Sequence, residues 1–131
     1  MIVVSESDQA IREAARGGLL PCAKAFGIAE RLGVAPDSVR ADADRLGVRI
    51  SVCQLGLFGY DAFGERRAAH RLSAVPPELR RALDEATDDG RLACVAAWRI
   101  ADERGLPRLL MGSAAETIGV RLCRCQLGCF D

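Results

Sequence analysis

The feature that most constrains the fold of this chain is an internal repeat with a period of 72 residues. Residues 53–58 read Cys-Gln-Leu-Gly-Leu-Phe, and residues 125–130 read Cys-Gln-Leu-Gly-Cys-Phe. From Gly18 to Phe58 the match to residues 90–130 needs no gap and contains 16 identities in 41 positions. A repeat of this length is one supersecondary unit used twice. Because two copies of about 55 residues would each be marginally stable alone, we expect them to share a core.

The pattern of apolar residues predicts three helices and one strand in each copy. In the second helix of the first copy, Cys22, Ala25 and Ala29 recur at helical spacing and form a core-facing stripe. Glycines end the helices, and a β-rich run follows the third helix. The predicted elements of the first copy are helices 9–16, 20–32 and 36–47 and strand 50–53. Those of the second are helix 77–87, a helix through 94–101 that stops at Gly105, helix 107–118 and strand 122–125.

A tight turn joins the second and third predicted helices. In the first copy Ala29 allows the helices to cross closely, Gly33 suits a left-handed turn, and Val34 and Val39 hold the two helices together. With a helix before and a strand after, the unit resembles the winged helix-turn-helix domain of LysR-type regulators and of the molybdate-responsive ModE regulators. The Cys-Gln-Leu-Gly-x-Phe endings resemble a group of small bacterial ModE-like proteins. In the second copy Arg104 departs from the apolar residue expected before the turn.

The predicted fold class is mainly α with a small β component. The resemblance implies tandem winged-helix-like units, each of three helices and a strand, in one compact pseudo-twofold domain. Each copy supplies one clear strand, and an unpaired strand leaves backbone groups without partners, so we expect the two strands to pair with each other. The first repeat then spans residues 1–58, a linker spans 59–76, and the second repeat spans 77–131.

The resemblance implies a DNA-binding transcription regulator. In such regulators the third helix enters the major groove, and basic side chains near it hold the phosphates. A duplicated unit would contact two adjacent stretches of double-stranded DNA. The residues expected to contact phosphates are Arg40, Arg45, Arg66, Arg67 and Arg71.

The charge pattern favours a different partner. The 18 basic residues equal the 18 acidic ones, so no overall field attracts nucleic acid. The outer face of the third helix carries three acids and two arginines in the first copy and is neutral in the second. A face without net positive charge is a weak phosphate site. The alternative is therefore a non-catalytic protein-interaction module or accessory protein, for example of a redox or metalloenzyme system.

The six cysteines divide into three groups. Cys22 and Cys94 lie on apolar helix stripes, which predicts small buried side chains. Cys53 and Cys125 open the repeated loop, in which we expect the glutamine to bond backbone groups while the leucine and phenylalanine fill the core. The remaining group is Cys123, Cys125 and Cys129, which would share one face of an ideal strand and are the candidates for a metal site. A fourth ligand is not evident, so we expect no metal and no cofactor.

The sequence also argues against an enzyme and against a membrane protein. His70 is the only histidine, and no serine or cysteine has an evident partner for nucleophilic catalysis. The longest apolar runs are far shorter than the roughly 20 residues that span a bilayer, and no signal-peptide pattern is present. We therefore expect a cytoplasmic protein whose cysteines are thiols.

Overall fold

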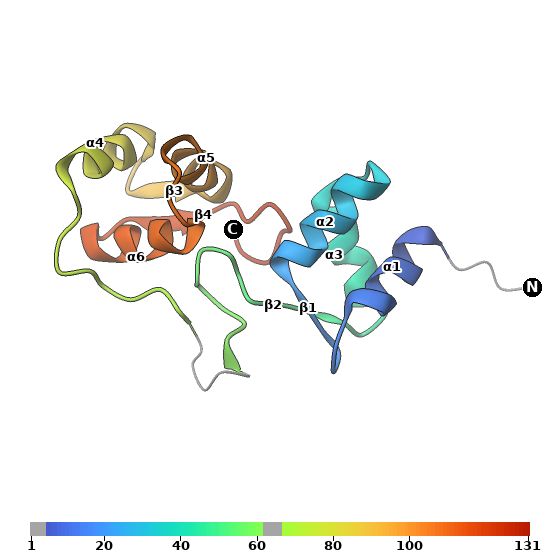
Figure 1. Cartoon of the computed structure of the whole chain (residues 1–131). Coiled ribbons are helices and arrows are strands. Elements are labelled where there is room, and N and C mark those ends of the chain that lie inside the picture. The colour runs from blue at the N-terminus through green and yellow to red at the C-terminus, as the bar shows by residue number, and fades with distance from the viewer. Residues whose placement is uncertain (1–4, 62–66) are drawn as a thin grey trace, which may run out of the picture.

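The computed structural model describes residues 5–61 and 67–131, and this part of the chain is mainly helical, with six helices, 52% helix and a small component of short strands. Two lobes follow one another along the chain (Figure 1). The first contains α1 (Glu6–Ala14), β1 (Leu19–Pro21), α2 (Cys22–Leu32), α3 (Pro36–Arg45) and β2 (Arg49–Ser51). The second contains α4 (Pro77–Ala86), β3 (Arg91–Ala93), α5 (Cys94–Arg104), α6 (Arg108–Ile118) and β4 (Arg121–Cys123). The two lobes thus have the same element order, as the repeat predicts.

Local sequence explains where the helices begin and end. The Ser5 hydroxyl accepts a hydrogen bond from the Asp8 amide at 3.0 Å and so caps α1. Gly33 and Gly105 end α2 and α5 in the left-handed conformation, with φ of 66° and 64°. These glycines form the two turns that the sequence predicts between the second and third helices.

The strands pair within each lobe, and the expectation that they pair between the copies is wrong. β1 runs parallel to β2 with Leu20 opposite Ile50, and β3 runs parallel to β4 with Leu92 opposite Leu122. A parallel pair needs a long crossover, and the two helices between the strands provide it in each lobe. The sequence did not predict β1, because Leu20 and Pro21 also suit the first turn of a helix. An amide at that position has no partner within the helix, so proline costs no hydrogen bond there.

The core confirms that the repeat is a packing unit. The eight largest side chains with almost no exposure form four counterpart pairs, each separated by the repeat period. Helices α1 and α4 supply one pair, the strands before α2 and α5 the next, helices α3 and α6 the third, and the Cys-Gln-Leu-Gly loops the last. The pairs are Ile11 with Leu83, Leu20 with Leu92, Val39 with Met111, and Leu55 with Leu127.

Each lobe sends its repeated loop to the other lobe. We call residues 53–58 the first exchange loop and residues 125–130 the second. The Leu55 carbonyl of the first loop lies against Gly112 of α6, and Gly128 of the second loop lies beside Arg40 of α3. In Figure 1 the chain after β2 accordingly runs toward α6, and the chain after β4 runs toward α2 and α3. Neither loop folds back only on its own lobe.

Residues 67–76 of the linker lie against the first exchange loop and α6. The amides of Ala68 and Ala69 both donate to the Gly56 carbonyl, at 2.8 and 3.0 Å. The Leu72 amide donates to the Thr117 hydroxyl at 2.7 Å. Residues 67–72 are not helical. Within residues 5–61 and 67–131, every helix is too short or too polar to cross a bilayer.

Candidate functional site

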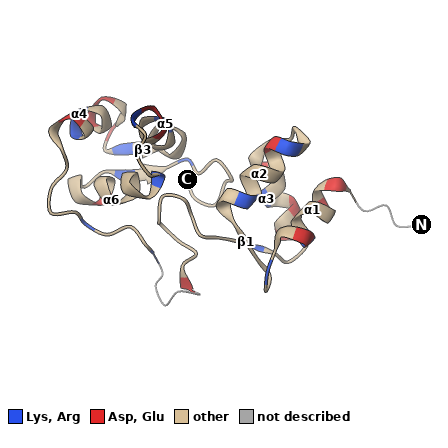
Figure 2. Ribbon diagram, viewed as in Figure 1, with Lys and Arg blue, Asp and Glu red and all other residues tan. Residues whose placement is uncertain are grey.

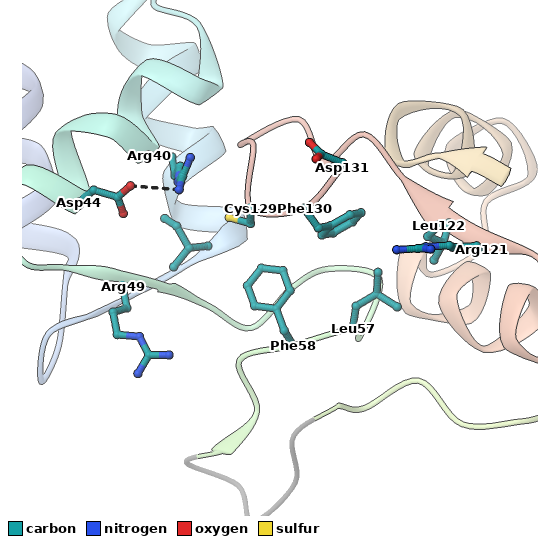
Figure 3. A pocket seen from close by; sticks show the side chains of 11 residues that line it. Arg40, Asp44, Arg49, Leu57, Phe58, Arg121, Leu122, Cys129, Phe130 and Asp131 are labelled. Atoms are coloured by element: carbon teal, nitrogen blue, oxygen red, sulfur yellow. Dashed lines mark ion pairs between the residues drawn. The ribbon is translucent and has the colours of Figure 1, made fainter.

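A concave surface lies where the two exchange loops meet. The Phe58 and Phe130 rings pack edge to face with their centroids 6.4 Å apart. Beside them opens a cavity of about 750 Å³, which we call the central cleft. Figure 3 shows the two rings between the lobes, with Arg49 on one side and Arg121 on the other. Each ring thus meets its own counterpart, and each arginine faces the cleft with its counterpart opposite.

Arg49 and Arg121 hold corresponding positions because each is the first residue of a strand. The Arg49 amide donates to the Gly18 carbonyl and the Arg121 amide to the Gly90 carbonyl, both at 2.9 Å. Both arginine side chains are exposed. Among the residues that the structure describes, neither arginine has a carboxylate within ion-pair distance. Sequence analysis missed them, although an identical exposed arginine in both copies was the available signal.

The arginines expected to contact DNA are mostly engaged with carboxylates. Arg40 pairs with Asp44 at 3.1 Å, and Arg67 pairs with Glu116 at 3.1 Å. Arg45 bonds Asp8, and its guanidinium lowers the pKa of that carboxyl. Arg71 is exposed, and Arg66 lies outside the described residues. The structure therefore does not gather the four described arginines into one basic surface, and Figure 2 shows acidic and basic positions interspersed along both lobes.

The outer faces of the two third helices differ. Gly112 and Ser113, on the face of α6 expected to be exposed, are buried. Gly112 lies beneath the Leu55 carbonyl, and the Ser113 hydroxyl accepts the His70 amide at 3.2 Å. By contrast, Ala41 and Asp44 on the outer face of α3 are exposed. Only α3 thus presents much of its outer face to solvent.

A second contact between the lobes surrounds Trp98. Its ring lies 4.5 Å from that of Phe26, its counterpart in the first repeat, and the Arg108 guanidinium lies 3.9 Å above it. Arg108 also donates to the Gln54 side-chain oxygen at 2.9 Å and to Asp102 at 2.8 Å. The pKa of Asp102 is lowered by this bond. Arg108 therefore joins its own helix to the first exchange loop.

The loop glutamines bond thiols and Arg108. Gln54 donates to the Cys22 sulfur at 3.7 Å, and Gln126 donates to the Cys94 sulfur at 3.6 Å. The expectation of backbone partners for these side chains is not met, because the helix that starts at each cysteine brings its sulfur to the loop. Burial raises the pKa of Cys22 and of Cys94 to about 11, so both remain protonated thiols.

The three carboxy-terminal cysteines do not share a strand face. β4 ends at Cys123, and Arg124 has a left-handed backbone with φ of 52°, which turns the chain before Cys125. In the part of the chain that the structure describes, no three His, Cys, Asp or Glu side chains are placed to hold a metal ion. Cys123 is buried, whereas Cys125 and Cys129 are half-buried.

None of the protein-family models, curated proteins or solved structures compared with this chain matches it. The functional argument therefore depends on the geometry of the cleft and of the cysteines.

Proposed function

We propose that the chain is a non-catalytic protein-interaction module built from two winged-helix-derived units, and that an acidic segment of its partner binds in the central cleft. One observation carries this proposal: the exposed counterparts Arg49 and Arg121 flank the Phe58 and Phe130 rings. A cytoplasmic location is part of the proposal, and it is supported by six cysteines that are all free thiols.

Arg40, Asp44 and Asp131 also line the cleft, and because Arg40 pairs with Asp44, Arg49 and Arg121 are the arginines placed to bind carboxylates, with apolar side chains between them. A guanidinium binds a carboxylate through two parallel hydrogen bonds, and arginine clusters are a common means of recognising acidic motifs. The half-buried rings of Phe58 and Phe130 offer apolar contact between the two charges. A segment with acidic residues on both sides of an aromatic or aliphatic residue fits this arrangement.

The test is selection from a displayed peptide library followed by titration of the selected peptides. We expect acidic peptides with an apolar centre, and we expect Arg49→Gln/Arg121→Gln to weaken them by about tenfold or more, since each hydrogen bond to a charge contributes about 1.5–3 kcal/mol. The matched control is Arg81→Gln/Arg104→Gln, which removes the same charge at exposed positions outside the cleft. Equal loss in both variants, or no selected peptide, contradicts the proposal.

Binding of double-stranded DNA is the second candidate function. It is supported by the left-handed Gly33 turn between α2 and α3 and by the exposed outer face of α3. Titration of duplex DNA at about 50 and 200 mM salt covers the range in which phosphate contacts lose most of their affinity. For a regulator, Arg71→Gln flattens the salt dependence by about one unit of slope. Duplex binding of this kind without peptide binding would replace the first proposal by the second.

A further inference from the structure

The second exchange loop closes on itself and returns Cys129 to the neighbourhood of Cys125. The Gly128 amide donates to the Cys125 carbonyl at 2.9 Å, and the Cys125 amide donates to the Phe130 carbonyl at 3.0 Å. Gly128 permits this turn because its φ of 80° suits a residue without a side chain. The turn thus holds Cys125 and Cys129, four residues apart, within one closed loop.

The same loop favours a thiolate at Cys125. The neighbouring Cys129 side chain and the backbone of Cys129, Leu127 and Phe130 lower the pKa of Cys125 well below the ordinary value for cysteine, and they outweigh its burial, which raises the pKa. The pKa of Cys129 is raised by its interaction with Cys125 and by burial. Cys129 therefore stays a thiol beside a thiolate.

Both sulfurs are accessible from clefts. Cys129 lines the central cleft with Arg40, and Cys125 lines a second cavity of about 710 Å³ near Arg91 and Arg124. Both side chains are half-buried, whereas Cys22, Cys53, Cys94 and Cys123 are buried. The buried Cys123 also lines this second cavity, but Cys125 and Cys129 are more exposed, so a small oxidant can reach this pair more readily than the four buried thiols.

We propose that Cys125 and Cys129 are a reactive dithiol that a hydroperoxide converts into a disulfide within the second exchange loop. The Cys125 thiolate attacks one peroxide oxygen, the O–O bond breaks, and the leaving hydroxide takes a proton, so that Cys125 becomes a sulfenic acid. The Cys129 sulfur then attacks the Cys125 sulfur and displaces the hydroxyl as water, which takes up the Cys129 proton. With hydrogen peroxide, two thiols lose two electrons and one peroxide becomes two waters.

The first exchange loop is a natural control. It has the same turn, in which Cys53 donates its amide to the Phe58 carbonyl at 3.1 Å and Gly56 bonds the Cys53 carbonyl at 2.9 Å. Leu57 stands where the second loop has Cys129. Cys53 is buried, and its pKa is raised by that burial. The proposal therefore assigns reactivity to one loop of the two, and it does not depend on the proposed protein partner.

The experiment treats the reduced full chain with hydrogen peroxide, blocks the remaining thiols, and locates the modified residues by peptide mass spectrometry. We expect a monomer lighter by two hydrogen atoms with Cys125 joined to Cys129, reversible by dithiothreitol. In Cys129→Ser we expect a sulfenic acid at Cys125 that dimedone traps. In Leu57→Cys, provided that its circular dichroism matches the parent, we expect any disulfide between Cys53 and residue 57 to form more slowly than that between Cys125 and Cys129, because Cys53 is buried.

A measurement on the unaltered chain keeps the test independent of the variants. With limiting iodoacetamide near about pH 7, the Cys125 thiolate should be alkylated at least about tenfold faster than Cys53. Equal rates for the two cysteines, or oxidation that joins other cysteines or separate chains first, would overturn the proposal.

Discussion

Gly112 of α6 packs directly beneath the carbonyl oxygen of Leu55, with no room for a side chain between them. The counterpart of Gly112 in the first repeat is Arg40, which lies beside Gly128 of the second exchange loop. In the first contact glycines lie on both sides, since a Cβ at Gly56 of the loop would overlap the Leu109 side chain of α6. The first exchange loop therefore requires glycine for close approach, whereas a Cβ at Gly128 would make only an ordinary contact of 3.5 Å with Arg40.

Gly112→Ala should destabilise the protein by about 1–3 kcal/mol, because the new methyl group overlaps a backbone oxygen that cannot rotate away. The loss should appear although alanine favours a helix over glycine by about 1 kcal/mol. Urea denaturation followed by circular dichroism measures the free energy of unfolding. Gly27→Ala is the matched control, since Gly27 lies in α2 with open space around its Cα, and it should be neutral or stabilising.

Phe58 and Phe130 should be coupled. Both rings are half-buried, so Phe58→Ala and Phe130→Ala should each cost less than the 3–5 kcal/mol typical of a fully buried aromatic. The edge-to-face contact should give an interaction energy of about 0.5–1.5 kcal/mol in a double-mutant cycle. Additive losses would show that the two loops do not stabilise each other through these rings.

Leu55→Ala and Leu127→Ala are the stronger tests of the loops as core. Both leucines are completely buried. Each substitution should cost about 2–5 kcal/mol in the free energy of unfolding, measured by urea denaturation. A loss within about 0.5 kcal/mol, the range of surface substitutions, would place the leucine outside the core.

Arg108→Met should cost about 1–3 kcal/mol, since it removes the bond to Gln54, the ion pair with Asp102 and the contact with the Trp98 ring. Trp98 is the only tryptophan, so its fluorescence reports this site directly. Arg99→Met is the control, because the Arg99–Glu103 pair is exposed and long at 3.9 Å and should contribute less than about 0.5 kcal/mol. An equal effect of the two substitutions would argue against the role of Arg108.

Alkaline pH should destabilise the protein through Cys22 and Cys94. Burial raises the pKa of both thiols from 9.0 to about 11, so between these values the unfolded chain loses protons that the folded chain keeps. The stabilising contribution is complete below pH 9 and is lost as the pH rises to about 11, on the order of 2–3 kcal/mol per thiol. Urea titrations across this range should show a steeper decline for the parent than for Cys22→Ala/Cys94→Ala. An equal decline of the free energy of unfolding in the parent and in the variant would contradict this role of the two thiols.

The sequence was sufficient to predict what depends on local pattern. The period of the repeat, the turns at Gly33 and Gly105 and the bounds of α6 all follow from residues close together in the chain. It was insufficient for contacts between the lobes, since periodicity does not show which surface covers another. The two-stranded pairing also escaped prediction, because a strand as short as Leu19–Pro21 carries too few residues for a pattern.

The candidate site was predicted less completely than the fold. Cys125 and Cys129 were candidates for a metal, but their relation as a closed pair depends on the turn at Gly128 and on the left-handed Arg124. Arg49 and Arg121 become neighbours of one cleft only when both loops have crossed. When the two repeats are aligned, Gly112 corresponds to Arg40. This replacement of a large residue by glycine was the sequence signal that another backbone segment packs closely against α6.

The crossing of the loops has a consequence for how such a molecule diversifies. In a symmetric homodimer every substitution occurs in both subunits, so a substitution that is tolerated at only one of the two sites cannot be retained. Here one polypeptide carries both halves, and each half can change alone. Cys129 lines the cleft, and the corresponding residue of the first repeat is Leu57. Gly112 packs against a loop, and the corresponding residue of the first repeat is Arg40. Covalent fusion thus gives the chain the asymmetry of a heterodimer with its stoichiometry fixed at synthesis.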